Sequence, residues 1–414
     1  MFVFIGSINK TRGDGTQFHD DSLNKSEFCA SLFLPSLSFQ SSKRRTRHIF
    51  GNSEDLSNSV LESLVERLYP DRNGTVMLAT WNLLPLLAGS AIFSMPFTVA
   101  VGGYFALVFM VVMSVMAAVT GILLIDCLYE VSPNSRNRKR VRKDLADIAR
   151  AVWGRVGAII VHSILVVYQI LGDVINILLL AKSVYSLLHE STKLSFVALS
   201  CIFSILAYPT LFIQKITVLA YLSLLSVISI MFGIVALIVV FIKERGVWAH
   251  NYGDIDFLDI ERFPLAVGII MYSCISHSVL PQVEGSMANP KESSQVIHIS
   301  YVFSTVVKLF VGIFGALTFG LQTESLITLN ASSMNEATKA VLDVSSIGYA
   351  VLNYPLNMFI VCETCDKIIV GTRVETTKRL YYLWVAASRF VLFAITVIGA
   401  VSYTHLTLPT ICSV

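Results

Sequence analysis

The sequence predicts an all-α polytopic membrane protein, and three observations support this fold class. Of its 414 residues, 54% are hydrophobic and only 14% are charged, and the mean hydropathy is +0.68. A soluble chain carries roughly 25% charged residues, so this composition excludes a water-soluble globular protein. The apolar residues fall into long runs, and basic residues gather in a few of the segments between them. The net charge of +3 is too small to predict a nucleic-acid partner.

The distribution of the apolar runs divides the chain into three regions. Residues 1–70 are polar, rich in serine and aperiodic, so we expect a disordered cytosolic N-terminal tail. Residues 71–401 hold all the long apolar runs and form the predicted transmembrane domain. Residues 402–414 look unlike the rest of the chain, and we interpret them as a foreign or misannotated tail.

Nine candidate membrane spans repeat along the central region. A helix needs about 20 apolar residues to cross the hydrocarbon core of a bilayer. The candidate runs are Val76–Ala100, Gly103–Leu128, Val156–Leu187, Leu194–Ile213, Ile216–Ile242, Pro264–Leu280, Ile299–Leu321, Ala340–Val361 and Leu380–Val401. We therefore predict nine spans that alternate in direction.

Basic residues predict which side of the membrane each loop faces, because cytoplasmic loops carry an excess of lysine and arginine. The loop after the second span carries eight basic residues from Arg136 to Arg155, and the loop after the eighth carries four from Lys367 to Arg379. Alternation places both loops and the N-terminal tail on one side, which we expect to be cytosolic. The sequon at Asn330 falls on the opposite, lumenal or extracellular side, where we expect glycosylation.

Glycine and proline interrupt two of the spans. The first contains Pro85, Gly89 and Pro96, and the sixth ends at Pro281 and Gly285. Lipid cannot satisfy the backbone groups that such breaks release, so they occur where the backbone is buried in protein or lines a cavity. A packed kink is the structural alternative. Breaks five spans apart predict two inverted five-helix repeats with a substrate site between them, as in secondary transporters.

The first break predicts how a substrate would bind. At Gly89 the absence of a Cβ lets a ligand approach the backbone closely. The N–H groups of Ser90 and Ala91, at the start of the half-helix, would receive a carboxylate. Carbonyl groups freed on the other side of each break would suit a cation or an ammonium group. The remaining predicted substrate residues are Asn82, Ser273, Ser276 and Tyr354.

Ionisable residues within the spans are further candidates, because a charge inside a bilayer is costly and marks a functional site by default. In the third span Asp173 shares a helix face with Gln169 and Asn176. Mutual pairing of Asp173 with Lys308, and a neutral His277 hydrogen-bonded within the bundle, are the structural alternatives. The candidates for proton coupling or intramembrane charge are Asp173, His277, Glu284 and Lys308.

Several short motifs between residues 76 and 401 form a recognisable set. The sixth span carries Phe263-Pro264, Gly268-Ile269-Ile270, Leu280-Pro281 and Glu284-Gly285-Ser286-Met287, followed by Pro290. Supporting motifs are Trp81-Asn82, Gly89 and Pro96, Gly102-Gly103-Tyr104, Cys127-Leu128-Tyr129-Glu130, Val307-Lys308, and Tyr354-Pro355 with Glu363. This set resembles the amino acid/auxin permease family, and within it most closely the vesicular inhibitory amino acid (GABA/glycine) transporters.

The resemblance implies the leucine-transporter fold, with its inverted five-helix repeat, nine of an expected eleven spans, alternating access, and exchange or co-transport with protons. It implies small neutral amino acids such as GABA or glycine as substrates. Two positions depart from the family, Ala91 where a second glycine is frequent and Pro85 where the vesicular carriers have a polar residue. Because two further spans would follow residue 401, we expect a C-terminally truncated sequence.

We therefore predict a proton-coupled secondary active transporter of small neutral amino acids in a lipid bilayer, with no metal or other cofactor. Coupling to sodium is left open. A membrane-embedded enzyme would need a catalytic cluster, and His250 with Asp254 and Asp256 has no second constellation beside it. A non-transporting sensor or receptor shares every motif, so only a flux measurement separates it from a transporter. Vesicular or other endomembranes are the expected location, with the plasma membrane, the amino acid transported and the oligomeric state left open.

Overall fold

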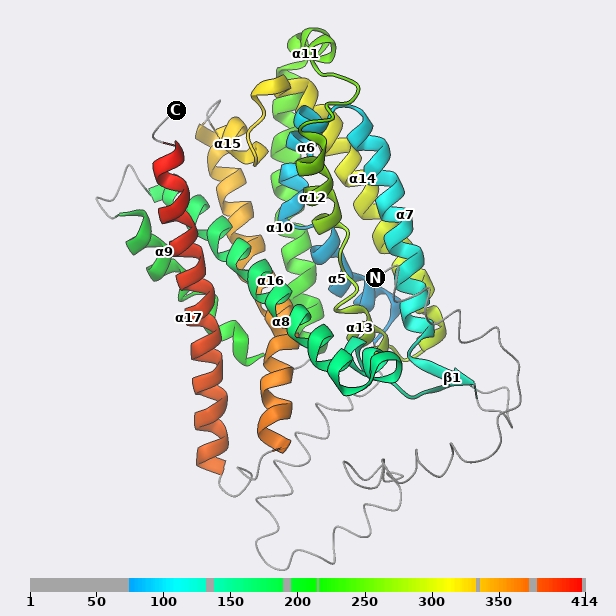
Figure 1. Ribbon diagram of the computed structural model, residues 1–414. Coiled ribbons are helices and arrows are strands. Elements are labelled where there is room, and N and C mark those ends of the chain that lie inside the picture. Colours follow the sequence, from blue (N-terminus) through cyan, green and yellow to red (C-terminus); the bar gives the residue numbers. More distant parts are fainter. Residues whose placement is uncertain are drawn as a thin grey trace, which may run out of the picture. The chain divides into compact units, whose positions relative to one another are not determined.

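A computed structural model describes residues 74–131, 138–188, 195–213, 216–332, 336–371 and 378–411. The predicted tail of residues 1–70 lies outside this described part, so its boundary stays a prediction. The described strands are β1 (Tyr129–Val131) and β2 (Arg138–Arg140), which pair as one short antiparallel hairpin. All other regular elements of the described chain are helices, which confirms the all-α class (Figure 1).

The helices follow the predicted spans in chain order. The longer ones are α5 (Val76–Leu87), α6 (Met95–Gly102), α7 (Phe105–Asp126), α8 (Leu145–Leu188), α9 (Phe196–Ser204), α10 (Ile216–Lys243), α12 (Phe263–Ser273), α14 (Ser293–Phe319), α16 (Glu336–Gly371) and α17 (Lys378–Ile411). Short helical pieces join or extend them: η2 (Ser90–Ser94), η3 (Tyr208–Phe212), η4 (Arg245–Val247), α11 (Trp248–Asp254), α13 (Leu280–Ser286), η5 (Pro290–Glu292), η6 (Gly320–Gln322) and α15 (Ile327–Ser332).

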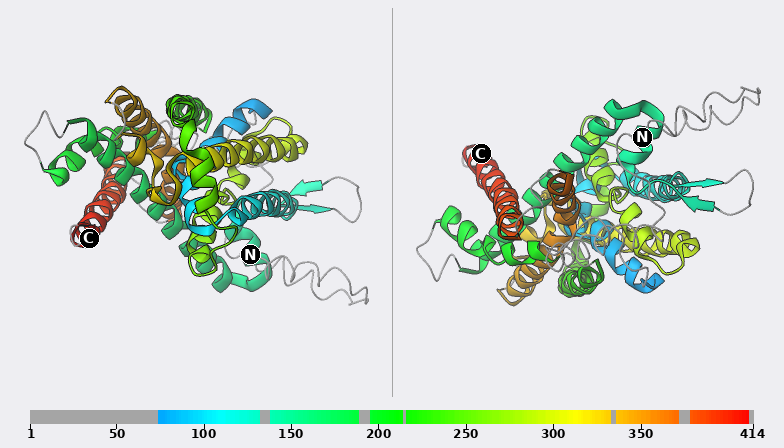
Figure 2. Two further views of the ribbon diagram at one scale, coloured as in Figure 1. Left: turned by 90° about the horizontal axis from the view of Figure 1, so that it is seen from above. Right: turned by 90° about the horizontal axis from the view of Figure 1, so that it is seen from below.

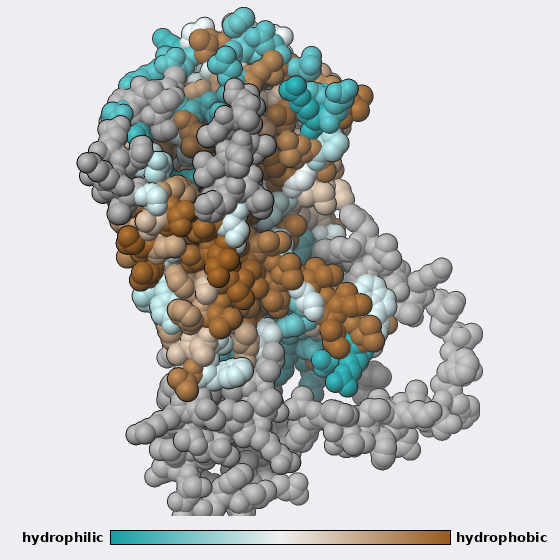
Figure 3. Space-filling view, turned by 60° about the vertical axis from the view of Figure 1, so that its left-hand side comes forward, coloured by the Kyte–Doolittle hydropathy of each residue, from teal (hydrophilic) through white to brown (hydrophobic). Residues whose placement is uncertain are grey.

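Seven stretches of the described chain are long and apolar enough to cross a membrane. They are Val76–Gly102, Phe105–Asp126, Leu145–Leu188, Val218–Lys243, Pro290–Gln322, Glu336–Asp366 and Leu383–Ser402. In Figure 3, hydrophobic residues form a band across the middle of the visible face, as expected of a surface in contact with lipid. A multi-pass membrane protein is therefore confirmed.

The predicted fourth and sixth spans are shorter apolar helices, Phe196–Phe212 and Phe263–Ser273. In the fourth, the α-helix ends at Ser204 and a 3₁₀ turn containing Pro209 follows, because proline lacks the N–H group that a continuing α-helix requires. The count of nine spans therefore stays a prediction.

Both spans that carry glycine and proline are interrupted, as predicted. In the first, α5 ends at Leu87, Gly89 adopts φ −89° and ψ −149°, and the chain resumes as η2 and α6. In the sixth, α12 ends at Ser273 and α13 begins at Leu280, which leaves residues 274–279 between two helices. The relation of these two breaks by an inverted repeat stays a prediction.

Two groups of packed helices surround the breaks. α14 packs against α5, α6 and α7, while α16 packs against α8 and α10; the end-on views of Figure 2 show the same arrangement. The larger apolar core includes Phe93, Ile177 and Leu237, and a smaller one includes Met95 and Met110. The hydrophobic residues that follow the first break, Phe93 and Met95, therefore anchor that span within the bundle.

A kink near the start of α8 separates a short helix from the predicted third span. Gly154 has φ 69° and ψ −158°, a left-handed conformation that favours glycine. Nothing lies within 4 Å of where a Cβ would project, so the backbone conformation alone explains the preference for glycine. The rest of α8 follows the predicted span Val156–Leu187 closely.

Candidate functional site

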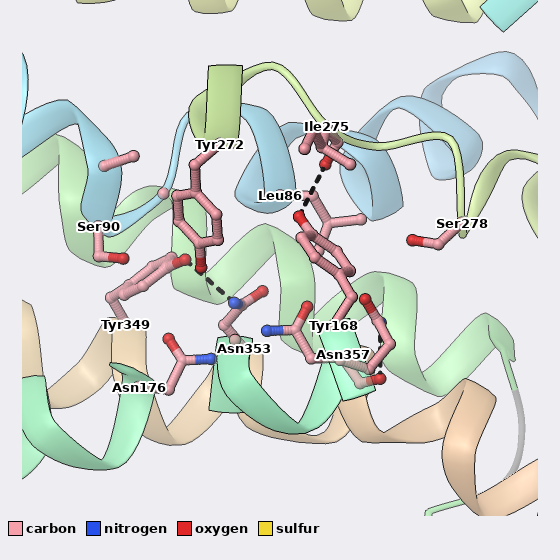
Figure 4. Close-up of a pocket in the computed structure, with 14 residues that line it drawn as sticks. Leu86, Ser90, Tyr168, Asn176, Tyr272, Ile275, Ser278, Tyr349, Asn353 and Asn357 are labelled. Carbon is pink, nitrogen blue, oxygen red and sulfur yellow. Dashed lines mark hydrogen bonds between the residues drawn. The ribbon is translucent and has the colours of Figure 1, made fainter. Parts of the chain in front are cut away.

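A pocket lies beside the break of the first span. Its walls come from that break, from α8, from the sixth span and from α16. The lining residues are Leu86, Gly89, Ser90, Ala91, Tyr168, Gln169, Gly172, Asn176, Tyr272, Ile275, Ser278, Tyr349, Asn353 and Asn357. Figure 4 shows the three asparagines on one side and the side chains of the sixth span on the other. The lining is polar, and it contains no aspartate, glutamate, histidine, lysine or arginine.

Gly89 is required by the close approach of Tyr349. A Cβ on Gly89 would lie 2.1 Å from the Tyr349 hydroxyl oxygen and 2.4 Å from the Pro85 carbonyl oxygen. The Tyr349 hydroxyl donates to that carbonyl at 3.2 Å and accepts from Asn353 Nδ2 at 3.0 Å. The predicted close approach is thus made by a side chain of α16, and the pocket lies beside it.

Three side chains on one face of α14 bind carbonyl groups released by the breaks. The bonds are Ser304 Oγ to Leu87 at 2.9 Å, Lys308 Nζ to Ser273 at 2.7 Å and Tyr301 Oη to Cys274 at 2.9 Å. Residues three and four apart share a helix face, so one surface of α14 serves both breaks. At these three positions the protein supplies its own donors, one of them the Lys308 ammonium group, and a substrate cation at a freed carbonyl stays a prediction.

The pocket includes three of the predicted substrate residues, Gly89, Ser90 and Ala91. The other four are buried outside its lining; three bond to other segments, and Ser273 bonds within its own helix. Asn82 accepts from Ser223 at 3.5 Å, Ser273 donates to the Ile270 carbonyl at 2.7 Å, Ser276 bonds to Tyr301 at 2.9 Å, and Tyr354 bonds to Thr396 at 2.8 Å. In this conformation Asn82, Ser276 and Tyr354 link different segments of the bundle.

Asp173 and Lys308 are both buried, and the structure does not pair them. Asp173 Oδ1 accepts from Asn176 Nδ2 at 3.1 Å, whereas the Lys308 ammonium group lies on the Ser273 carbonyl. The structural alternative, in which Asp173 and Lys308 pair with each other, is therefore not observed.

His277 lies in the break of the sixth span and faces α7. Its Nε2 is 2.9 Å from Thr120 Oγ1, and its side chain is absent from the pocket lining. The ring is largely buried. The histidine is thus hydrogen-bonded between two spans, and its role in proton coupling stays a prediction.

Glu284 on α13 binds the β-hairpin that follows α7. Its carboxylate accepts a hydrogen bond from the Tyr129 hydroxyl and forms an ion pair with Arg140 Nη1 at 3.2 Å. Arg140 also donates to the Pro281 carbonyl at 2.8 Å. The glutamate therefore joins the end of the sixth span to the hairpin and does not line the pocket.

Sequence reasoning missed the whole pocket wall on α16, together with one buried ion pair. Asn353 and Asn357 are four residues apart in a predicted span, the same signal that identified Gln169 and its neighbours on α8. An arginine within the ninth span was also detectable as an intramembrane charge. It is Arg389, which lies 2.7 Å from Asp366 of α16.

Comparison with known families decides the class of protein. The family of transmembrane amino acid transporter proteins matches residues 72–408. This chain belongs to that family. The resemblance drawn from the motifs is confirmed, and a transporter family rather than an enzyme family accounts for the chain. The match ends within residues 402–414, so the interpretation of that segment stays a prediction.

Curated relatives agree with this assignment. The vesicular inhibitory amino acid transporter of Xenopus tropicalis is 26% identical over 298 residues, which is 71% of this chain and 56% of the relative. The vesicular GABA transporter of Caenorhabditis elegans is 26% identical over 340 residues, or 80% and 67%. Amino acid transporter AVT1E of Arabidopsis thaliana is 29% identical over 274 residues, or 63% and 49%. The chain spans about half the length of the curated relatives it matches.

Proposed function

We propose that this protein is a secondary active transporter that carries small neutral amino acids across a membrane by alternating access. The observation that supports this most directly is the position of the pocket, which touches the interrupted first and sixth spans. Inverted-repeat transporters bind their substrates at such discontinuous helices. A polar lining without formal charge suits a zwitterion, whose two charges cancel.

The substrate carboxylate is proposed to bind at Ser90 and Ala91. Both residues line the pocket and lie in the first turn after the break. The first N–H groups of a helix have no partner within that helix, and its dipole favours an anion there by about 0.3–1 kcal/mol. In the structure the Ser90 N–H bonds to the Tyr349 hydroxyl, and the carboxylate is proposed to replace that bond. The bulky rings of Tyr168, Tyr272 and Tyr349 in the lining favour a substrate with a small side chain.

Proton coupling is proposed for this transporter, with sodium as the alternative ion. Asp173, His277 and Glu284 are buried titratable groups in or beside the broken spans, where ionisable residues commonly form proton relays. The names of several relatives support a vesicular membrane, and the basic loops support a cytosolic N-terminus.

Binding and flux together test the proposal. Radiolabelled glycine and GABA would be measured first for equilibrium binding to the purified chain in lipid nanodiscs, then for uptake into proteoliposomes with an imposed pH gradient. Uptake driven by the pH gradient supports a proton-coupled transporter. Uptake driven only by a sodium gradient would identify sodium as the coupling ion instead. Binding without uptake favours the sensor, and the absence of binding by every small neutral amino acid contradicts the proposal.

A further inference from the structure

Two buried acceptor atoms on neighbouring helices lack a hydrogen-bond partner in the structure. They are Asp173 Oδ2 on α8 and Asn353 Oδ1 on α16, whose residues are 0% and 1% exposed. Almost all buried polar atoms in proteins are hydrogen-bonded, so an unpaired one requires an explanation. Asn353 lines the pocket, and Asp173 sits on α8 among the lining residues Gly172 and Asn176. Asn353 therefore borders the cavity, whereas Asp173 is buried beside two lining residues of α8 without lining the cavity itself.

The orientation of the Asn353 amide follows from its neighbours. The single hydroxyl proton of Tyr349 is donated to the Pro85 carbonyl. The Tyr349 oxygen can then only accept, so Asn353 presents Nδ2 to it at 3.0 Å and keeps its carbonyl oxygen for another donor. Figure 4 shows this bond and the rest of the amide within the pocket.

Among the described residues, no lysine or arginine interacts with Asp173. Asn176 on α8 and Asn357 on α16 both hydrogen-bond to its carboxyl group, and the neutral side chains of Tyr272, Tyr349 and Tyr354 lie near it. Lys308 is engaged with the Ser273 carbonyl instead. A buried carboxylate without a cation is strongly disfavoured, so this group needs either a proton or a cationic donor from outside the protein.

We infer that Asp173 and Asn353 form the amine-binding half of the pocket and bind the ammonium group of the substrate. An ammonium group offers three donors and one positive charge, which matches an unpaired amide oxygen beside an uncompensated carboxylate. With the substrate absent, a proton on Asp173 removes the charge, so ligand and proton compete for one carboxyl group. This inference rests on the proposed function. It assigns the ammonium group to the wall formed by α8 and α16, whereas the sequence predicted the freed carbonyls of the breaks.

The test compares an amino acid with its desamino analogue. Glycine, alanine and GABA would be screened for binding in nanodiscs, and the tightest ligand would be paired with acetate, propionate or butyrate respectively. In the wild type the amino acid should compete far better than the acid alone. In Asp173→Asn this preference should fall about tenfold or more, because a charged hydrogen bond is lost, while the affinity of the desamino acid changes less than about twofold, because its contacts are kept.

Two further variants separate a binding role from a structural one. Asp343 on α16 is another buried acid with an unpaired oxygen, but it lies ten residues before Asn353 on that helix, so Asp343→Asn should keep the preference for the amine. Combining Asp173→Asn with Asn353→Asp moves the carboxylate across the pocket and should restore part of that preference. This rescue is the result that a merely structural aspartate cannot produce.

The possible failures are distinguishable. If the wild type binds none of the amino acids, the proposed function fails and the inference fails with it. If the wild type prefers the amine and Asp173→Asn keeps that preference, only the inference is overturned. Equal loss of both ligands in Asp173→Asn, or a double variant as weak as the single one, likewise contradicts an amine site at these residues.

Discussion

The Lys308 ammonium group lies 2.7 Å from the carbonyl oxygen of Ser273, at the point where the sixth span breaks. One helical turn earlier, Ser304 donates to the Leu87 carbonyl at the break of the first span. A single helix, α14, thus satisfies backbone groups of both interrupted spans. A movement at either break must either break its hydrogen bond to α14 or move α14 with it. α14 therefore links the two breaks mechanically.

Replacing Lys308 should destabilise the protein. Lys308→Met keeps the length of the side chain but leaves the Ser273 carbonyl without its donor, at a cost of about 1–3 kcal/mol for an unsatisfied buried group. We expect a lower midpoint in thermal unfolding of the protein in nanodiscs. In Lys308→Ala, millimolar methylammonium should recover part of the loss by filling the vacated position.

A matched control distinguishes the charge from the packing. Ser304→Ala removes a neutral hydrogen bond at the other break, which is worth about 0.5–1.5 kcal/mol, and methylammonium should not affect it. A Lys308→Met protein that unfolds at the wild-type temperature would show that the Ser273 carbonyl finds another donor.

Gly89 should tolerate no side chain at all. In Gly89→Ala the new methyl group would overlap the Tyr349 hydroxyl and the Pro85 carbonyl, at 2.1 Å and 2.4 Å, so either α16 or the break must move. We expect amino acid binding to be lost while the protein still inserts into the membrane. Gly268→Ala is the control, because nothing lies within 4 Å of its Cβ position. If the two variants bind amino acids with equal affinity, Gly89 is not part of the substrate-binding site.

The breaks of the fold were predictable from sequence, whereas the far wall of the pocket was not. Glycine and proline report directly on local backbone, so Gly89 and Pro281 marked the interruptions without knowledge of their neighbours. The contact between Tyr349 and Gly89 joins positions far apart in the chain. Nothing local to either residue indicates which face of α16 turns towards the first span.

The same distinction explains the misplaced polar residues. Ser273 and Ser276 lie at the sixth break as predicted, but Lys308 and Tyr301 from α14 take their carbonyl or hydroxyl groups. Periodicity shows that a helix face is polar without showing what lies opposite. The prediction of span lengths was limited in a similar way. A run of apolar residues does not reveal where an α-helix ends and a 3₁₀ turn such as η3 begins.

The ion pair between Glu284 and Arg140 should couple the hairpin to the end of α13. The Glu284 side chain is 0% exposed and that of Arg140 is 20% exposed. In a double-mutant cycle with Glu284→Gln and Arg140→Met, we expect a coupling free energy of about 0.5–3 kcal/mol. The exposed pair of Arg142 with Glu130 is the control and should show about 0.2–1 kcal/mol.

His277 should affect the pH dependence of uptake if it exchanges protons during the transport cycle. His277→Gln retains a group able to hydrogen-bond Thr120 but cannot titrate near neutral pH, so the pH profile of uptake should flatten while substrate binding persists. Thr120→Val is the control, because it removes the 2.9 Å contact and leaves the imidazole. An unchanged profile in His277→Gln would assign the histidine a structural role.

The sequon at Asn330 tests the membrane topology. Asn330 lies in α15, where its amide donates to the Gln322 carbonyl at 2.9 Å and accepts from the Glu324 N–H at 2.7 Å. Substituting the asparagine would disturb these bonds, so Ser332→Ala is the better variant, because it abolishes the sequon and leaves the asparagine in place. Expressed in a eukaryotic cell, the wild type should shift on gels after endoglycosidase treatment and Ser332→Ala should not. The sequence Asn73-Gly74-Thr75 is a second sequon, before the first span and on the predicted cytosolic side. A glycan at Asn73 in place of Asn330 would invert the predicted orientation of every span.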